Sequence, residues 1–321
     1  IKAARADGQQ VTADIYPYVN NGLGMDAFIH PRHFGQGRAR LIGRLDNEEL
    51  RAEIRQEIET TSGWENWFRH VGFDWDKVIV GQTNDQRYRE LVGQSVADMA
   101  KANEEEPWET FFNLVRAGAF ALPQSMTDAN KILAMQQEFV SFCTDVGPAG
   151  GSRSASHPRA FGSFTRMLSR YVRDLGAISL ERAVAQASAA AANDVLAYDR
   201  GRIAEGLAAD IIVFDYEQLA DRATFSKPHR PSEGMRHVIV NGEVALAEGK
   251  FTGNRAGRVL RGPGYDASKS SQSVVSGEPS APLAHVDELM QRIIEEHRAA
   301  GASLAISDHG RLVYARGYGY A

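Results

Sequence analysis

Two hydrophobic patterns alternate through most of the sequence: the spacing of amphipathic helices and short continuous apolar runs. Within residues 45–61, Leu50, Ile54 and Ile58 recur at a helical spacing among charged residues, which predicts an amphipathic helix. Similar patterns predict further helices, with a break near Pro107 because proline cannot continue a helix. These further helices are expected over residues 95–118, 126–139, 161–176 and 179–197.

Short apolar runs bounded by turn residues separate these helices and predict strands. We expect Thr127 or Asp128 to cap the helix that precedes the last of these runs. The segment 28–40 is basic and glycine-rich and predicts a loop. An alternation of helices with short buried strands is typical of parallel α/β structure, so we predict the α/β class. The strands are expected over residues 11–16, 77–81 and 139–147.

The pattern changes after residue 198, where short strands and tight turns replace the helices. Strands are predicted over residues 201–206, 209–215 and 237–249. The last of these contains Asn241 and Gly242, a pair that favours a type I′ hairpin because both central residues need positive φ. We therefore predict a small β domain over residues 199–261, following an α/β region over residues 1–198.

Residues 262–282 are rich in glycine, serine and proline and predict a linker. Beyond it, residues 285–301 have the period of an amphipathic helix, and residues 302–321 predict a hairpin that turns at Asp308 to Gly310. We expect residues 283–321 to begin a further, truncated α+β unit. Because the chain opens on Ile1 rather than methionine and closes inside the predicted hairpin, we expect it to be cut at both ends.

Composition narrows the range of functions. The hydrophobic content is 43% and the net charge is −5, without a basic run carrying interleaved aromatic residues, so we expect no nucleic-acid partner. A single cysteine, Cys143, excludes internal disulfides and cysteine-rich zinc sites. No apolar stretch approaches the roughly 18 residues of a membrane helix, so we expect no membrane partner. Oligomeric state and location, cytoplasmic or exported, stay open.

Asp145 is the first candidate for chemistry. It follows the predicted strand 139–147 and precedes a glycine- and serine-rich loop. In a parallel barrel, catalytic groups gather at the carboxyl ends of the strands, where an acid can serve as a metal ligand or as a general base. The pattern is equally compatible with a turn acid that caps the next element. His30 and His33 have a spacing that suits two metal ligands, but no suitably spaced carboxylate completes a site.

A resemblance to a known family adds to this interpretation. The segment SFCTDVGP, followed by HPRAFGSFTRML, resembles the last barrel strand and following helix of the N-acyl-D-amino-acid deacylases of the amidohydrolase superfamily. VTADIYPY resembles an earlier barrel strand of that group, and DRGRIAEGLAADIIVFD its C-terminal segment. The likeness covers residues 1–261. The chain departs from the usual Ser-Asp-Gly by having Val146 after the acid, and it carries a different loop after the YPY strand.

The resemblance implies the later part of a (β/α)8 barrel, a small β-sandwich domain and a zinc ion at the barrel mouth. A zinc-activated water would attack the amide carbonyl of a small N-acyl-D-amino acid. Asp145 would bind metal and act as general base and acid. Arg159 would bind the substrate carboxylate, because a guanidinium matches a carboxylate bidentately. Tyr16 and Tyr18 are candidates for hydroxyl contacts to that carboxylate, and His157 for lining the pocket, although buried structural roles fit all three.

The resemblance also places the other zinc ligands before Ile1. We therefore expect the chain alone to be inactive and to bind zinc weakly, and one tightly bound zinc per chain would contradict this. Two alternatives stay open: a dihydropyrimidinase-like hydrolase of cyclic amides, and a catalytically inactive fragment or scaffold. Residues 283–321 resemble the opening helix and hairpin of serine β-lactamase-like hydrolases, whose nucleophile would lie beyond Ala321.

Overall fold

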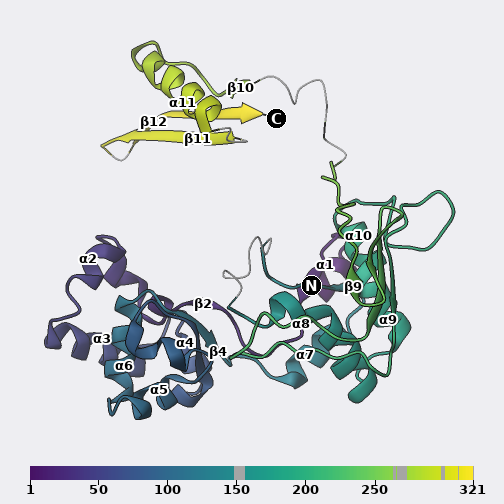
Figure 1. Ribbon diagram of the computed structural model, residues 1–321. Coiled ribbons are helices and arrows are strands. Elements are labelled where there is room, and N and C mark those ends of the chain that lie inside the picture. The colour runs from purple at the N-terminus through teal and green to yellow at the C-terminus, as the bar shows by residue number, and fades with distance from the viewer. Residues whose placement is uncertain (148–155, 263–264, 266–272, 298–300, 310, 321) are drawn as a thin grey trace. The chain divides into compact units, whose positions relative to one another are not determined.

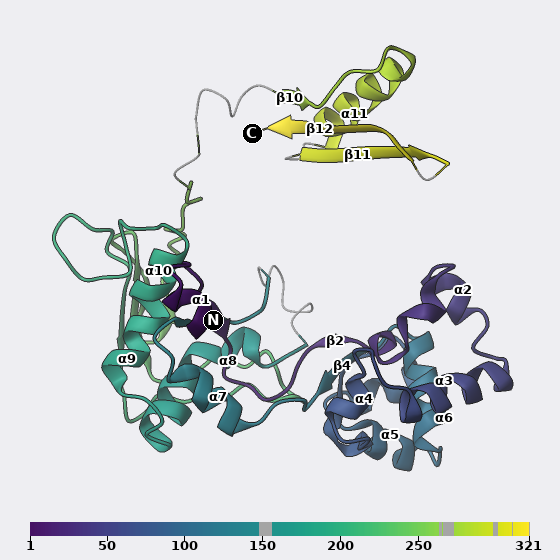
Figure 2. The same cartoon turned by 180° about the vertical axis from the view of Figure 1, so that it is seen from behind.

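The computed structural model describes residues 1–147, 156–262, 265, 273–297, 301–309 and 311–320. It divides into two compact units, Ile1–Gly257 and Arg258–Ala321, which are described separately (Figures 1 and 2). The predicted glycine- and serine-rich loop after Gly147 lies largely outside the described residues. The division of the chain into four predicted segments stays a prediction.

One parallel strand pair organises the first unit. β1 (Ala13–Ile15) lies beside β5 (Val140–Phe142), with Asp14 opposite Ser141. All three residues of β5 are buried, as the apolar run predicts. β1 is shorter than the predicted strand, and Pro17 follows closely, a residue that has no N–H to donate to a strand ladder. Because the strands are parallel, the segments that follow them leave the sheet at the same edge.

Helices pack around this strand pair. Thr127 caps α7, its hydroxyl oxygen accepting a hydrogen bond of 3.2 Å from the backbone N–H of Asn130. The predicted helices over residues 161–176 and 179–197 form, although parts of both have π-helical geometry. The elements are α1 (Lys2–Ala6), α7 (Asp128–Met135), α8 (Arg159–Arg166), a π-helix (Met167–Asp174), α9 (Leu180–Ala185), a π-helix (Gln186–Ala190) and α10 (Ala191–Asp194). Their core includes Met135, Phe142, Met167, Tyr171 and Leu219.

A helical segment lies between β1 and α7. The predicted helical face of Leu50, Ile54 and Ile58 is buried, and the predicted break falls between α5 and α6, which begins at Pro107. The helices are α2 (Arg38–Ile42), α3 (Glu48–Thr60), α4 (Trp67–His70), α5 (Val96–Ala102) and α6 (Pro107–Arg116), with 3-10 helices at Met25–Phe28, Pro31–Phe34, Trp75–Lys77 and Gln86–Leu91. The predicted loop 28–40 is therefore wrong in part, since it contains one 3-10 helix and the start of α2.

The strands of this segment are antiparallel, which corrects the expected parallel order. β2 (Leu23–Gly24), β4 (Phe120–Pro123) and β3 (Val78–Gln82) form a sheet in which β4 is central. The apolar run 77–81 correctly predicts a buried strand. Its direction was not predictable, because strands covered on both faces show the same continuous hydrophobic pattern in either orientation.

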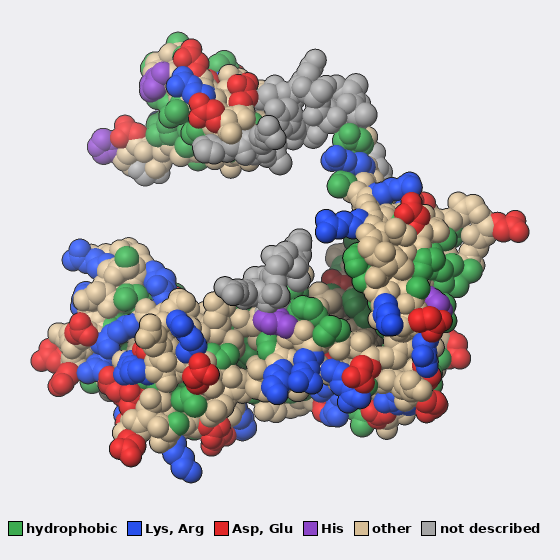
Figure 3. Space-filling view, viewed as in Figure 1, with side chains coloured by type: hydrophobic (Ala, Val, Ile, Leu, Met, Phe, Trp, Pro, Cys, Tyr) green, Lys and Arg blue, Asp and Glu red, His purple; other side chains and the backbone are tan. Residues whose placement is uncertain are grey.

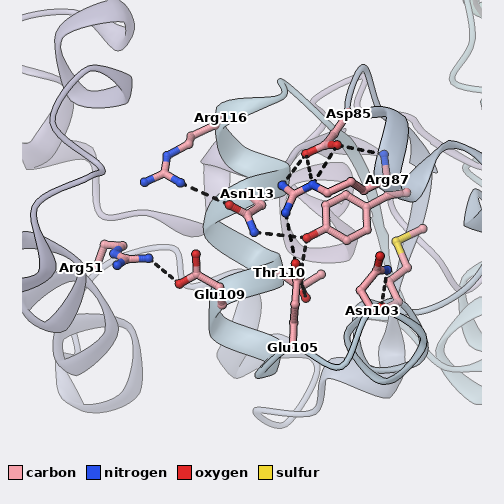
Figure 4. Close-up of polar contacts among 11 residues, drawn as sticks. Arg51, Asp85, Arg87, Asn103, Glu105, Glu109, Thr110, Asn113 and Arg116 are labelled. Atoms are coloured by element: carbon pink, nitrogen blue, oxygen red, sulfur yellow. Dashed lines mark hydrogen bonds and ion pairs between the residues drawn. The ribbon is translucent and has the colours of Figure 1, made fainter.

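Polar side chains inside the helical segment bond to one another (Figure 4). Glu105 accepts hydrogen bonds from the hydroxyls of Tyr88 and Thr110, the latter at 2.7 Å. Asn113 donates to the Tyr88 hydroxyl at 3.2 Å. Burial raises the pKa of Tyr88 to about 12, so the phenol stays protonated at neutral pH. These groups satisfy one another and are engaged in structure.

A four-stranded antiparallel sheet ends the first unit, in the order β6 (Ile211–Phe214), β7 (Met235–Val240), β8 (Glu243–Ala247) and β9 (Lys250–Phe251). The predicted hairpin is confirmed: Asn241 and Gly242 have φ of 49° and 84°. The predicted strand 201–206 is wrong, because Ile203 is 83% exposed between glycines with positive φ. Among the described residues of this region the strands form one sheet, rather than the two of a sandwich.

In the described part of the second unit, an α-helix packs on a three-stranded sheet. The predicted helix and hairpin form as α11 (Ala284–His297), β11 (Gly301–Asp308) and β12 (Arg311–Tyr320). β10 (Ser273–Ser276) pairs with β12, so the predicted linker contains a strand, and a 3-10 helix spans Ala281–Leu283. Asp287 accepts hydrogen bonds of 2.6 Å from the Tyr314 and Tyr318 hydroxyls, which joins the helix to the sheet. Gly310, in the predicted turn, lies outside the described residues.

The surface of the first unit carries mixed charge. Basic and acidic side chains are interspersed over the face shown in Figure 3. Within the described parts of the chain, every helix is too short or too polar to cross a membrane.

Candidate active site

The candidate site lies where β1 and β5 end. Tyr16 and Tyr18 follow β1, while Cys143 and Asp145 follow β5, so the parallel pairing brings these segments to one edge. Asp145 has φ of 49°, in the left-handed region that aspartate tolerates better than most residues. The first residue of α8, Arg159, reaches the same place.

Asp145 and Arg159 form an ion pair. Asp145 Oδ2 lies 2.9 Å from Arg159 Nη1, and the arginine side chain is 8% exposed whereas that of the aspartate is 59% exposed. Among the described residues, Nε of the buried guanidinium has no hydrogen-bond partner, and Nη1 meets Asp145 in the ion pair without forming a hydrogen bond. A buried cation with unused donors beside a more exposed acid is suited to binding an anionic group that enters from solvent.

Tyr16 lies against Arg159 and against a second buried cation, Lys131. The guanidinium carbon of Arg159 lies 4.6 Å from the centre of the Tyr16 ring, and Lys131 Nζ lies 4.1 Å from the same centre. The Tyr16 hydroxyl lies 2.9 Å from Asn21 Oδ1 and 3.2 Å from the carbonyl oxygen of Asn20. Burial raises the pKa of Tyr16, so it is a neutral phenol that presents its ring to both cations.

His157 is bonded to the backbone through both ring nitrogens. Nδ1 accepts a hydrogen bond of 3.0 Å from the Arg159 N–H, so Nε2, 3.1 Å from the carbonyl oxygen of Asn20, must be the protonated donor. Burial lowers the pKa of His157 to about 3, which keeps the imidazole neutral. The geometry favours the structural alternative that the sequence left open, because the ring ties the start of α8 to the segment after β1.

Tyr18 is engaged in a similar way. Its hydroxyl donates a hydrogen bond of 2.7 Å to Asp221 Oδ2, and burial raises its pKa. The Arg166 guanidinium lies 4.7 Å from the Tyr18 ring centre and 3.5 Å from Asp221. A side-chain carbon added at Gly162 would lie 2.2 Å from Asp221 Oδ1, so this junction requires glycine. Substrate contacts of both tyrosines stay predictions.

The described residues contain no group of three or more histidine, cysteine or acidic side chains placed to hold a metal ion. Asp145 is the acid at the strand edge and would supply one ligand at most within this part of the chain. His33 Nε2 lies 2.7 Å from Glu57, and His30 Nδ1 accepts a hydrogen bond from the Arg32 N–H at 3.1 Å. The described residues alone therefore do not form a zinc site.

Three residues of this region were not found from the sequence. Lys131 has the pattern of an ordinary charged residue on an amphipathic helix, yet it is 3% exposed. Asn20 acts through its backbone carbonyl, which carries no sequence signal. Asp221 comes from a loop before β7, and only the folded chain brings it to Tyr18.

Fold and site together define an α/β protein with an acid–arginine pair at the carboxyl edge of parallel strands. The chain belongs to the amidohydrolase family, whose sequence profile matches residues 72–246, more than half of its length. The matched region contains both Asp145 and Arg159.

Individual relatives extend the comparison. N-acyl-D-glutamate deacylase of Alcaligenes xylosoxydans xylosoxydans is 38% identical over 173 residues, 54% of this chain and 34% of the relative. The crystal structure of a D-aminoacylase superposes with a TM-score of 0.57 at 26% identity, covering 81% of this chain and 44% of that one. N-acyl-D-glutamate deacylase from Bordetella bronchiseptica was solved with zinc and a phosphonate inhibitor. It superposes with a TM-score of 0.55 at 27% identity, covering 76% of this chain and 41% of that one. The chain thus spans about a third of the curated relative's length.

Proposed function

We propose that the chain contributes the later part of a (β/α)8 barrel in a zinc-dependent hydrolase that removes the acyl group from N-acyl-D-amino acids. The pairing of Asp145 with the buried Arg159 carries this proposal. It lies within the region matched by the family profile, and relatives that match the chain are deacylases of this kind.

Arg159 would bind the carboxylate of the substrate. Its guanidinium is buried and keeps unused donors among the described residues, a state that an incoming carboxylate relieves by accepting hydrogen bonds. The bound substrate carboxylate would compete with Asp145 for hydrogen bonds from the guanidinium. The acid would then be free to exchange a proton.

Asp145 would act as the proton carrier. Its side chain is the more exposed partner of the ion pair, as a group that meets water and substrate must be. The carboxylate would accept a proton from the water that attacks the amide carbonyl carbon. When the carbon–nitrogen bond breaks, the same proton would pass to the leaving nitrogen, giving a carboxylate and a free amino acid.

Zinc enters the proposal through the relatives, because a matched deacylase structure contains it. When bound, zinc would supply Lewis-acid activation of water and of the carbonyl. Within the described residues, Asp145 is the one ligand we assign to it.

A second proposal concerns the fold of the second unit. We infer that residues 283–321 begin a serine β-lactamase-like domain. A helix followed directly by a long hairpin, α11 with β11 and β12, supports this assignment. The inference concerns fold alone, since it assigns no catalytic group within these residues.

Hydrolysis of paired enantiomers tests the main proposal. The complete gene product, supplied with zinc, is assayed against N-acetyl-D- and N-acetyl-L-amino acids, and against dihydrouracil as a cyclic amide. We expect hydrolysis of the D-compounds only. Equal activity on both enantiomers would contradict the deacylase proposal, and activity on dihydrouracil alone would favour the cyclic-amide alternative. Inactivity toward every compound would favour the scaffold.

A further inference from the structure

Lys131 is a buried ammonium at the candidate active site that the mechanism above does not use. It is 3% exposed, on the second turn of α7, and α7 packs against both β1 and β5. Burying a lysine costs free energy unless an anion compensates it. Within the described part of the chain no carboxylate lies at ion-pair distance from its Nζ.

The charges around Lys131 leave a deficit of anions. Asp145, the acid at this edge, has one oxygen 2.9 Å from Arg159 Nη1. His157 is neutral, because Nδ1 accepts the Arg159 N–H and Nε2 lies 3.1 Å from the carbonyl oxygen of Asn20. Lys131, Arg159, His157 and Asp145 therefore comprise two cations, one neutral ring and one anion.

Both cations lie against the ring of Tyr16. Lys131 Nζ and the Arg159 guanidinium carbon lie 4.1 and 4.6 Å from its centre. Burial lowers the pKa of Lys131 to about 8, so the ammonium is still predominantly charged at pH 7. Two positive groups held by one aromatic ring present two separate points of attraction for anions.

We propose that Lys131 is a specificity-determining residue that binds a second carboxylate of the substrate, selecting acidic N-acyl-D-amino acids. This inference rests on the proposed function. Arg159 has the planar fork that matches the α-carboxylate, whereas the lysine ammonium is a compact point charge that suits a side-chain carboxylate reached from a different direction. The relative with 38% identity is named for N-acyl-D-glutamate, a substrate with two carboxylates.

The test compares N-acetyl-D-glutamate with N-acetyl-D-glutamine, which has nearly the same shape but lacks the second charge. The values of kcat/KM are measured for the complete gene product and its Lys131→Met and Lys131→Arg variants. Lys77→Met, which removes an exposed lysine of the same unit, is the matched control. Urea unfolding of each variant verifies that it is folded.

We expect wild type and the Lys77→Met control to prefer the glutamate compound. Lys131→Met should reduce that preference by about 10- to 100-fold, the range for losing a hydrogen bond to a charged group, with little change for the glutamine compound. Lys131→Arg should restore most of it. An equal loss on both compounds, or no loss, would overturn the role of Lys131 while leaving D-selective hydrolysis intact. Absence of D-selective hydrolysis in the wild type would overturn both proposals.

Discussion

Acidification should destabilise the first unit through His157. Its pKa is lowered by burial from about 6.5 to about 3. The unfolded chain therefore takes up a proton near pH 6.5, while the folded chain resists it until near pH 3. Between these values the unfolded state binds more protons, so stability falls as the pH falls.

The magnitude follows from the same two pKa values. Between pH 7 and pH 5, the free energy of unfolding should fall by about 2 kcal/mol through this one residue, and between pH 7 and pH 3 by about 4 kcal/mol. The structural cause is specific. Protonation of Nδ1 would convert the acceptor of the Arg159 N–H into a donor that faces another donor at 3.0 Å.

Urea unfolding at pH 7 and pH 5, followed by tryptophan fluorescence and circular dichroism, measures this loss. All four tryptophans lie in the first unit, so fluorescence follows that unit. In His157→Gln, the side chain does not titrate, and about 2 kcal/mol of the pH dependence should disappear. Replacement of the half-exposed His70 by glutamine serves as the control and should keep the dependence. An identical pH dependence in wild type and His157→Gln would refute the reasoning.

Two further predictions concern the residues around the site. Arg159→Met should raise KM for N-acetyl-D-amino acids by about 10- to 100-fold, because a charge-assisted hydrogen bond is lost. The KM of the corresponding amides, which lack the carboxylate, should rise less. Equal effects on acids and amides would contradict carboxylate binding. Gly162→Ala should lower the free energy of unfolding by about 1–3 kcal/mol, because the new carbon would lie 2.2 Å from Asp221 and 2.3 Å from the Tyr18 hydroxyl, and an unchanged urea midpoint would contradict this.

Local patterns predicted the elements whose cause is local. The apolar spacing of Leu50, Ile54 and Ile58, the cap at Thr127 and the Asn241–Gly242 turn all depend on residues close in sequence. Strand direction in the β2–β4–β3 sheet depends on partners far along the chain, and the pattern of a buried strand does not encode it.

In the candidate site, too, the sequence predicts the residues that belong to a local motif and misses those that depend on distant partners. Asp145 and Arg159 were identified from their motif, and the structure pairs them at 2.9 Å. Lys131 was not identified, because a lysine on an amphipathic helix has the same local pattern whether its ammonium faces solvent or a buried tyrosine. For His157 the sequence left pocket lining and a structural role both open. Its ring nitrogens bond to backbone groups, one of them 137 residues away in sequence, which no local pattern encodes.

The central claim is that Asp145 carries the proton between water and the leaving amine. The kcat of Asp145→Asn toward N-acetyl-D-amino acids tests it most directly, with the exposed Asp46→Asn as control. An asparagine keeps the shape but cannot accept the proton, so kcat should fall by about 10²- to 10⁴-fold while the control is unchanged. An Asp145→Asn variant with kcat within a few-fold of wild type would contradict the claim.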